Sequence, residues 1–304
     1  MAKYALSSNF STSLRRLSVT VVMASQVNED TSWLQRLFPF WKHEIYITDP
    51  PGTNSSLISV KGLESMVYLT YIIDNYEVLP DVVIFTHGGR YRWHHDDPLY
   101  DNARVLSRLQ IPYVQEQGYV NLRCVWTVGC PAEIHINRKG GDKDLANGGP
   151  LPGAVYAAAF HELFPGRDLP SRVGTSCCAN FAAAKSAIVA RPRQDYERYR
   201  RWLVDTDLDS SAGAKVLEYS WHIIFGKEAA FCPLARQCYC KVFGMCNIPL
   251  EGPGTSKAMY SLPKFATLPD GWPWVGWDNQ WQNATSVGYI PGEELIDSLP
   301  TALW

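Results

Sequence analysis

Hydrophobic and polar positions in the first third of the chain follow an alternation of strand and helix periods. β-branched and apolar residues over 17–25 predict a buried strand, and 43–48 predicts a second one. Between them, 28–37 carries helix-capping residues followed by Trp and Leu, and 62–76 has apolar residues at helical spacing. A short apolar run at 82–85 adds a third strand. This succession predicts an α/β fold whose sheet is parallel or mostly parallel, with right-handed crossovers.

The second half of the chain has mostly helical periodicity. Prolines separate its apolar segments, and a cysteine-rich segment at 232–246 follows them. We expect helices over 155–163, 178–189, 195–204 and 212–225. No internal repeat or linker divides the chain, so we predict a flexible arm over 1–17, a single α/β catalytic domain over 18–250, and a Trp-, Pro- and Gly-rich tail over 251–304 packed on that domain.

Composition and motifs exclude several classes of protein. With 46% hydrophobic residues the chain can bury enough surface to fold, which excludes disorder over most of its length. No stretch reaches the roughly 18 continuous apolar residues of a membrane span. With 28 basic and 30 acidic residues the net charge is -2, so overall charge does not indicate nucleic-acid binding, and no DNA partner is expected. The absence of a nucleophile elbow, a phosphate loop and a dinucleotide fingerprint argues against the commonest hydrolases, kinases and dehydrogenases.

The N-terminal segment allows two interpretations of the compartment. Arg15 and Arg16 precede the apolar run 17–24, which can be a secretory signal or a first buried strand after a disordered arm. Thr20 interrupts the run, and a turn and a helix follow at once, which favours the strand. With 8 Cys the chain is too cysteine-poor for a disulfide scaffold. We therefore predict a cytoplasmic protein with reduced thiols.

The densest polar cluster, 87–97, directly follows the predicted strand at 82–85. Ligands bind outside the carboxyl ends of strands in open parallel sheets, so a site is expected here, and Gly88 and Gly89 allow close approach of a ligand. The adjacent aspartates can hold a divalent cation or pair with a cationic substrate, and the histidines can act as bases. A solvated polar loop is the alternative. The candidates are Asp96, Asp97 and His94 for catalysis, and His87 and Arg90 for substrate binding.

A second candidate site lies in 217–226. Glu218, Trp221 and His222 are spaced three and four residues apart, which places them on one face of the predicted helix. An acid and an imidazole at this spacing can form a base and its orienting partner, or two metal ligands. A routine surface pair is the alternative, but the apolar flanks favour burial, where a glutamate needs a partner. We predict catalytic roles for Glu218 and His222 and a substrate contact for Trp221.

Arginines are concentrated between residues 191 and 201. Their guanidinium groups can bind phosphates in two-pronged fashion, and Tyr196 and Tyr199 among them can stack on bases. A solvated helix face is the alternative, because Asp195 and Glu197 partly neutralise the run. The candidate RNA contacts are Arg191, Arg193, Arg198, Arg200 and Arg201.

The cysteines leave zinc, disulfides and buried thiols all open. Zinc sites usually space paired ligands by two to four residues, and the C-x5-C spacing of Cys232 to Cys238 and of Cys240 to Cys246 is longer. Cys124 and Cys130 repeat that spacing, while Cys177 and Cys178 begin a predicted helix, a usual setting for buried thiols. We expect no required cofactor, and the one candidate for a structural zinc is the set Cys232, Cys238, Cys240 and Cys246.

Several spaced motifs between residues 18 and 246 carry a family resemblance. They are Tyr68-Leu-Thr-Tyr-Ile-Ile-Asp74-Asn-Tyr76 with Leu79-Pro-Asp-Val-Val-Ile-Phe85-Thr-His87-Gly88, Gly118-Tyr-Val-Asn-Leu-Arg123-Cys124 with Gly129-Cys-Pro131, Cys177-Cys178-Ala-Asn-Phe181, Tyr196-x2-Tyr199-x2-Trp202, and Glu218-Tyr-x-Trp221-His222-x2-Phe225-Gly226. Together they resemble a fungal family long carried as a domain of unknown function, part of which makes arginine-containing cyclodipeptides. The first half is also similar to an A-type glycosyltransferase fold. Lys61-Gly62-Leu-Glu64 stands where related chains show Asn-x-Gly-x-Glu, so the Asn of that pattern is absent here.

The resemblance implies an aminoacyltransferase that takes arginyl-tRNA and a second aminoacyl-tRNA and joins their amino acids into a diketopiperazine, a secondary-metabolite scaffold. Such an enzyme positions an activated ester, deprotonates the attacking amine and stabilises the oxyanion. The arginine side chain needs a carboxylate, for which Glu64 joins Asp96, Asp97 and Glu218 as a candidate. The alternatives are a nucleotide-sugar-dependent glycosyltransferase of A-type fold and an interaction module stabilised by zinc.

Overall fold

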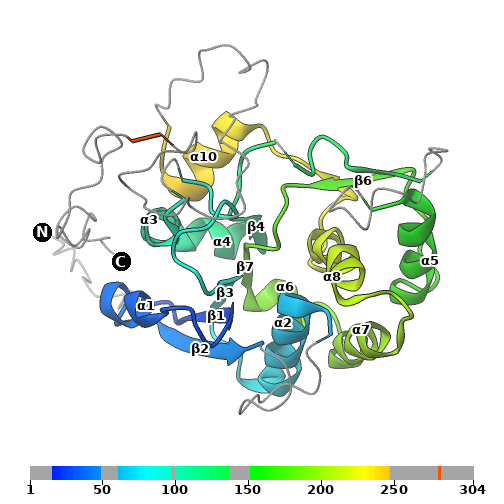
Figure 1. Ribbon diagram of the computed structural model, residues 1–304, viewed down its shortest axis with the longest axis horizontal. Helices are drawn as coiled ribbons and strands as arrows, with labels where there is room; N and C mark the ends of the chain where they lie inside the picture. The colour runs from blue at the N-terminus through cyan, green and yellow to red at the C-terminus, as the bar shows by residue number, and fades with distance from the viewer. Residues whose placement is uncertain are drawn as a thin grey trace, which may run out of the picture.

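The structure, a computed structural model, describes residues 16–48, 61–97, 100–126, 128–136, 151–246 and 280–281. Most of the predicted arm and of the predicted tail lies outside these residues. The described part is built around a five-stranded sheet with helices on both faces (Figure 1). Its strand order is β2 (Lys42–Ile47), β1 (Val19–Ser25), β3 (Val82–His87), β7 (Phe181–Ala184) and β4 (Tyr119–Asn121).

The sheet is mixed, so the prediction of a parallel sheet is correct only for its first three strands. β1 pairs in parallel with β2 and β3, whereas β7 runs antiparallel to both β3 and β4. The parallel pairs follow from the predicted succession of strands and helices, with α1 (Ser32–Leu37) and α2 (Leu63–Asp74) as the connecting helices. Several helices and strands separate β7 from β3 in the sequence, so no single crossover helix sets the direction of β7.

β7 lies in a segment that the periodicity assigned to a helix. Its alanines, Ala182, Ala183 and Ala184, are all buried. Alanine has the highest helix propensity, so the local sequence favours a helix over 178–189. Pairing with β3 on one side and β4 on the other overrides that preference, and helix begins only at α6 (Lys185–Val189).

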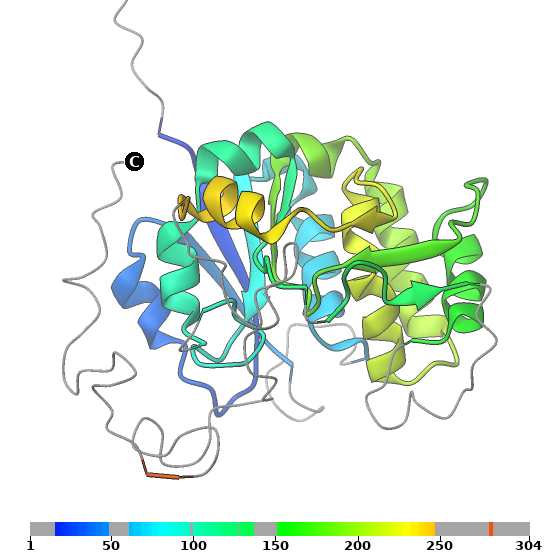
Figure 2. The same ribbon diagram turned by 90° about the horizontal axis from the view of Figure 1, so that it is seen from above.

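Side chains of the sheet alternate between two hydrophobic cores. From β1, Val22 packs in the first core and Val21 in the second, and β3 divides Phe85 and Ile84 in the same way. The first core is covered by α2, α5 (Gly153–Leu163), α7 (Arg193–Asp205), α8 (Ser210–Glu218) and α9 (Trp221–Ile224), and the second by α1, α3 (Asn102–Arg108), α4 (Ile111–Gln117) and α10 (Ala235–Phe243). In Figure 2 the yellow α10 lies beside the teal helices α3 and α4, although it is distant from them in sequence. Among the described helices, none combines the length and the hydrophobicity that a membrane crossing requires.

A smaller sheet supports the loop that leads into β7. Its strands are β5 (Ile134–His135), β6 (Arg172–Thr175) and β8 (Ala230–Phe231), in that order. Elsewhere in the fold, a short 3-10 helix, η1 (Tyr76–Val78), connects α2 to β3 of the main sheet. Gly129 has a φ of 96°, and a Cβ there would lie 1.9 Å from the backbone oxygen of Thr175. Only glycine allows this close approach, which packs the segment 128–136 against β6.

The cysteines form four disulfides, which corrects two predictions. Cys124–Cys238 and Cys130–Cys232 join segments 114 and 102 residues apart, whereas Cys240–Cys246 and Cys177–Cys178 are local. The four cysteines predicted to bind zinc, Cys232, Cys238, Cys240 and Cys246, are therefore bonded to sulfur and form no metal site. Four disulfides are typical of oxidising compartments and count against a cytoplasmic protein with reduced thiols.

Candidate active site

A cleft of about 890 Å³ opens at the carboxyl ends of the parallel strands. Ser25 ends β1 and His87 ends β3, and both line the cleft. The start of α2, the end of α8 and the loop from β6 to β7 form its other walls. Ligand sites in sheets of this kind occur at the same edge, so the cleft lies where the segment 87–97 led us to expect a site.

Two glutamates face this cleft from different helices. Glu218 ends α8, and Glu64 lies in the first turn of α2. Burial raises the pKa of Glu218 to about 7, and the negative charge of Glu64 acts in the same direction. Burial raises the pKa of Glu64 to about 7 as well. Near neutral pH one member of the pair can therefore act as an acid while the other acts as a base.

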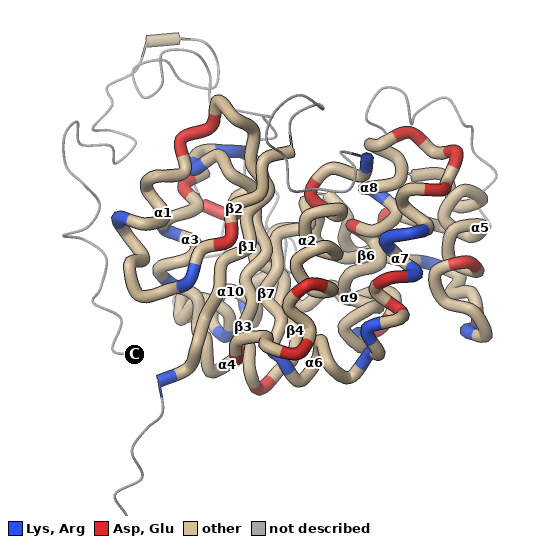
Figure 3. Tube along the Cα trace, turned by 90° about the horizontal axis from the view of Figure 1, so that it is seen from below, with Lys and Arg blue, Asp and Glu red and all other residues tan. Residues whose placement is uncertain are grey.

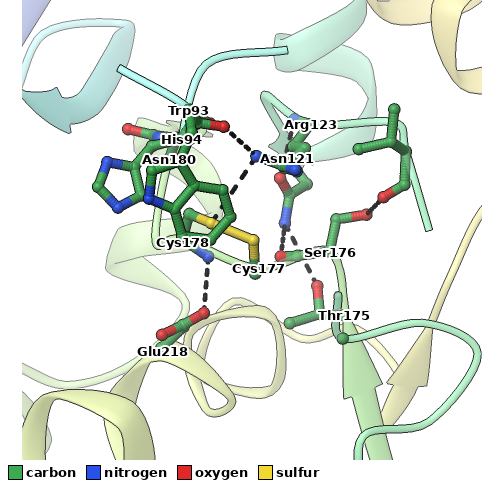
Figure 4. Close-up of a disulfide and its surroundings, with 12 residues drawn as sticks. Trp93, His94, Asn121, Arg123, Thr175, Ser176, Cys177, Cys178, Asn180 and Glu218 are labelled. Atoms are coloured by element: carbon green, nitrogen blue, oxygen red, sulfur yellow. Dashed lines mark hydrogen bonds between the residues drawn. A yellow bond between two sulfur atoms is a disulfide. The ribbon is translucent and has the colours of Figure 1, made fainter. Parts of the chain in front are cut away.

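The backbone of Cys178 holds two of the polar groups in place. The Oε1 atom of Glu218 accepts a hydrogen bond of 2.6 Å from the N–H of Cys178 (Figure 4). The carbonyl oxygen of Cys178 lies 2.8 Å from Nε2 of His87. Because a carbonyl only accepts, Nε2 carries the proton in this bond, and Nδ1 of the neutral ring keeps its lone pair. One residue thus orients both an acid and an imidazole.

His87 and His94 stack face to face. Their ring centroids are 4.7 Å apart, with 26° between the ring planes. Burial lowers the pKa of both rings, and the positive charge of Arg92 adds to that lowering in each. Both rings are therefore neutral at pH 7 and serve as hydrogen-bonding groups rather than as charges.

A buried arginine lies behind the Cys177–Cys178 disulfide (Figure 4). The Nη1 atom of Arg123 donates a hydrogen bond of 2.7 Å to the carbonyl oxygen of Trp93 and lies 3.9 Å from Sγ of Cys178. Burial lowers the pKa of Arg123, and the negative charge of Asp96 opposes that shift. A positive charge compensated by Asp96 therefore lies next to the disulfide, although Arg123 itself does not line the cleft.

Asp96 and Asp97, predicted as catalytic residues, do not line the cleft. Asp96 accepts hydrogen bonds of 2.5 Å from the backbone N–H of Cys124 and 2.8 Å from the hydroxyl of Tyr239. Asp97 lies 3.7 Å from the guanidinium of Arg108. Both aspartates face the protein interior, where they pair with the N–H of Cys124, the hydroxyl of Tyr239 and the guanidinium of Arg108. The sequence shows two adjacent acidic residues, but it does not show which donors the fold places beside them.

Three further candidates, Arg90, Trp221 and His222, also lie outside the cleft. Arg90 makes two hydrogen bonds of 2.9 Å to the carboxylate of Asp101. The ring of Trp221 is fully buried in the first core. His222 is fully buried too, with Nε2 3.0 Å from the carbonyl oxygen of Ala229. Their positions indicate structural roles.

The helix predicted over 212–225 is interrupted after Glu218. α8 ends at that residue and α9 begins at Trp221, so Glu218 and His222 do not share a helix face. Trp221 must be buried and Glu218 must reach a hydrogen-bond donor, and one straight helix does not satisfy both. The predicted pair of Glu218 and His222 is therefore not formed. The imidazole nearest to this role is that of His87, which shares the backbone of Cys178 with Glu218 as its hydrogen-bond partner.

The arginines expected to contact RNA lie on or beside α7, and none of them lines the cleft. Tyr196 and Tyr199, expected to stack on bases, are fully buried. Acidic and basic residues follow one another along α7 in Figure 3. Three of the arginines are paired with acids of α7: Arg191 with Asp195 at 3.1 Å, Arg193 with Glu197 at 3.1 Å and Arg198 with Asp195 at 2.7 Å. Of the other two, Arg200 is half-buried and Arg201 is exposed.

The cleft also contains charged residues that the sequence analysis did not select. Arg92 is paired with Glu29, and Lys215 of α8 lines the same cleft. A Cβ on Gly88 would lie 2.4 Å from Oγ of Ser25, so this glycine makes room for the protein's own side chains rather than for a ligand. Arg92 lies within the polar segment 87–97, which is the one sequence signal that points to it.

The fold and the cleft define a three-layer α/β protein with paired carboxyl groups at the carboxyl ends of its parallel strands. A family described as a protein of unknown function, DUF3431, matches residues 21–241. The match spans well over half of the chain, so the protein belongs to this family. Comparisons with curated proteins and with solved structures found no match.

Proposed function

We propose that the protein is an aminoacyltransferase that joins arginine and a second amino acid into a diketopiperazine. The observation that carries this proposal is the pair Glu64 and Glu218, whose pKa values are both about 7 in one cleft. Two acidic groups suit a cationic substrate, and a carboxyl group of this pKa suits proton transfer from an amine. The resemblance of the chain to a family that makes arginine-containing cyclodipeptides supports the same reaction.

Glu218 is the proposed base. An α-amino group ordinarily has a pKa of about 7.7–8.0, so a carboxylate of pKa about 7 accepts its proton with little free-energy cost. The freed amine attacks the carbonyl of an aminoacyl ester, the C–N bond forms, and the ester C–O bond breaks with release of the alcohol. Attack by the remaining amine on the second ester closes the six-membered ring and releases the second alcohol.

Glu64 is the proposed partner of the arginine side chain. A guanidinium group binds a carboxylate best through two parallel hydrogen bonds, which require both carboxylate oxygens. In Glu218, Oε1 already accepts from the N–H of Cys178. Glu218 is also the proposed base, and one carboxylate cannot hold the guanidinium and accept the proton of the amine, so we assign the guanidinium to Glu64. Lys215 supplies a positive charge in the same cleft for the developing oxyanion.

Aminoacyl-tRNAs are the proposed ester donors. Of the arginines along α7, the exposed Arg201 is the first to test for a phosphate contact. The ion pairs that Arg191, Arg193 and Arg198 make with acids on α7 reduce the charge available to phosphates. We therefore expect Arg201→Ala to lower the salt dependence of tRNA binding by about one phosphate contact.

A glycosyltransferase of A-type fold is the second candidate. Four disulfides favour it, because they are typical of oxidising compartments and charged tRNA is a cytoplasmic substrate. The strand and helix order of the first half is compatible with that fold. The inward position of Asp96 and Asp97 counts against a form that binds its donor through a divalent cation on these residues.

Mass spectrometry of small products tests the leading proposal. Purified protein is incubated with tRNA, synthetases, ATP and amino acids that include isotope-labelled arginine, with and without ribonuclease. We expect a labelled cyclic dipeptide that ribonuclease abolishes. Glu218→Gln should lower kcat by about 10²–10⁴, whereas Glu116→Gln, an exposed position outside the cleft, should leave it unchanged.

The absence of any labelled cyclic product, with the tRNAs shown to be charged, would refute the proposal. A thermal shift produced by a sugar nucleotide would then favour the second candidate.

A further inference from the structure

The adjacent cysteines Cys177 and Cys178 lie in the wall of the cleft, and the proposed reaction does not use their sulfur atoms. They belong to the loop between β6 and β7 and are 2% and 7% exposed. Their Sγ atoms and a carboxylate oxygen of Glu218 all lie within 4.8 Å of one another. Two sulfurs and one carboxylate are therefore gathered at one point of the cleft.

This set of donors matches the chemistry of a thiophilic cation. Zinc binds thiolate at about 2.3 Å and carboxylate at about 2.0–2.2 Å, so tetrahedral donors stand roughly 3.5–4 Å apart. The spacing of the three groups is within reach of that geometry once the sulfurs are no longer bonded to each other. In the oxidised form neither sulfur is a thiolate, which is the form of cysteine that binds a metal.

Reduction by an external thiol would convert this wall into ligands. Two equivalents of a thiol RSH break the Cys177–Cys178 bond, yield two cysteine thiols and leave the oxidised RSSR. Cation binding then releases the two thiol protons. Arg123, whose Nη1 lies 3.9 Å from Sγ of Cys178, places a positive charge beside one of the two sulfurs.

The backbone of the loop can accommodate the change. Cys178 and Ala179 have φ values of 85° and 46°, a left-handed conformation that residues other than glycine rarely adopt. Opening the ring allows this segment to relax toward ordinary backbone angles, and the two sulfurs can then move apart to the spacing of metal ligands.

We propose that reduction of the Cys177–Cys178 disulfide creates a binding site in the cleft for a divalent cation of the zinc and cadmium class, held by the two thiolates and Glu218. Three protein donors leave a fourth position of a tetrahedral ion open to the cleft. The site goes beyond the proposed reaction and does not depend on it, since it rests on the positions of the sulfur and carboxylate atoms.

Titration with Cd²⁺ tests this site directly. The protein carries Cys240→Ala and Cys246→Ala, which remove the other local bridge, and is reduced with a phosphine until two thiols are free. Peptide mapping should place these thiols at Cys177 and Cys178. We expect about one equivalent of Cd²⁺ to produce a thiolate-to-metal absorption band, and the oxidised protein to produce none.

Two variants separate this site from adventitious binding. Cys177→Ser with Cys178→Ser should abolish the band, and it should fold, because a bridge between neighbouring residues scarcely constrains the unfolded chain. Glu218→Gln should weaken Cd²⁺ binding at least about tenfold by removing one of the three donors. The proposal is overturned by free thiols that map elsewhere, by an absent band in the reduced protein, by a band that survives the double serine variant, or by an affinity that Glu218→Gln leaves unchanged.

Discussion

The contribution of each disulfide to stability should grow with the logarithm of the length of chain that it closes. Cys124–Cys238 joins positions 114 residues apart, and Cys240–Cys246 joins positions 6 residues apart. Both involve α10, since Cys238 and Cys240 lie on that helix. The pair therefore offers a long and a short bridge on the same element of the fold.

Loop-closure entropy sets the expected magnitudes. The bridge Cys130–Cys232 lies inside the loop of Cys124–Cys238 and would shorten that loop to about 14 residues, so the comparison is made in a protein that carries Cys130→Ala and Cys232→Ala. In that protein, a bridge closing a loop of roughly 115 residues restricts the unfolded chain by about 4.8 kcal/mol, and one closing about 7 residues by about 2.3 kcal/mol. The difference of about 2.5 kcal/mol depends only on the ratio of the loop lengths. In the protein without Cys130–Cys232, Cys124→Ala with Cys238→Ala should therefore destabilise the fold by that much more than Cys240→Ala with Cys246→Ala.

Denaturant unfolding of the two double variants, followed by circular dichroism, measures both losses in free energy. The protein without Cys130–Cys232, and the same protein also lacking Cys177–Cys178, which closes no loop of consequence, serve as the references. Equal losses for the long and the short bridge would contradict this reasoning and indicate that native contacts of α10, rather than chain entropy, determine the effect.

Three further predictions concern the core and the titrating groups. Trp221→Ala should lower the free energy of unfolding by about 3–5 kcal/mol, because the ring is fully buried, and a loss below about 1 kcal/mol in denaturant unfolding would contradict the core position. Asp96→Asn should cost about 3–5 kcal/mol in the same assay, because it removes the negative charge that compensates Arg123, and Arg123→Met should restore part of the loss if that pairing is the cause. Folded Glu64 and Glu218, with pKa values of about 7 against an ordinary 4.5, hold protons that the unfolded chain releases, so the free energy of unfolding should fall as pH rises from 4.5 to about 7. Glu218→Gln should make the free energy of unfolding less dependent on pH. A free energy of unfolding that rises with pH across this window would show that the pKa values of these carboxyl groups are not raised.

Local patterns in the sequence were sufficient for the first half of the sheet. The strand predicted at 17–25 is β1, the helix predicted at 62–76 contains α2, and the strand predicted at 82–85 is the start of β3. These elements follow from β-branched runs and from helical spacing, both of which act over a few residues. The sequence also pointed to the edge of the sheet at which the structure has a cleft, because the carboxyl ends of parallel strands define that edge.

Local patterns failed where a partner distant in sequence decided the outcome. The alanines of β7 favour a helix, and only their pairing with β3 and β4 makes them a strand. The helix predicted over 212–225 is interrupted because Trp221 packs in the first core while Glu218 reaches the backbone N–H of Cys178, and one straight helix does not place both. The cysteines gave no indication of their pairing, since their spacing fitted zinc, disulfides and buried thiols alike.

The sequence by itself thus determined the order of strands and helices in the first half and which segment would lie beside a cleft. The tertiary structure decided which side chains meet there, because Glu64, His87, Cys178 and Glu218 come from four separate elements. It also decided that Asp96 and Asp97 face inward. The physical reason is that burial and hydrogen bonding, which raise the pKa of one carboxyl group and fix another in the core, depend on neighbours that only the folded chain brings together.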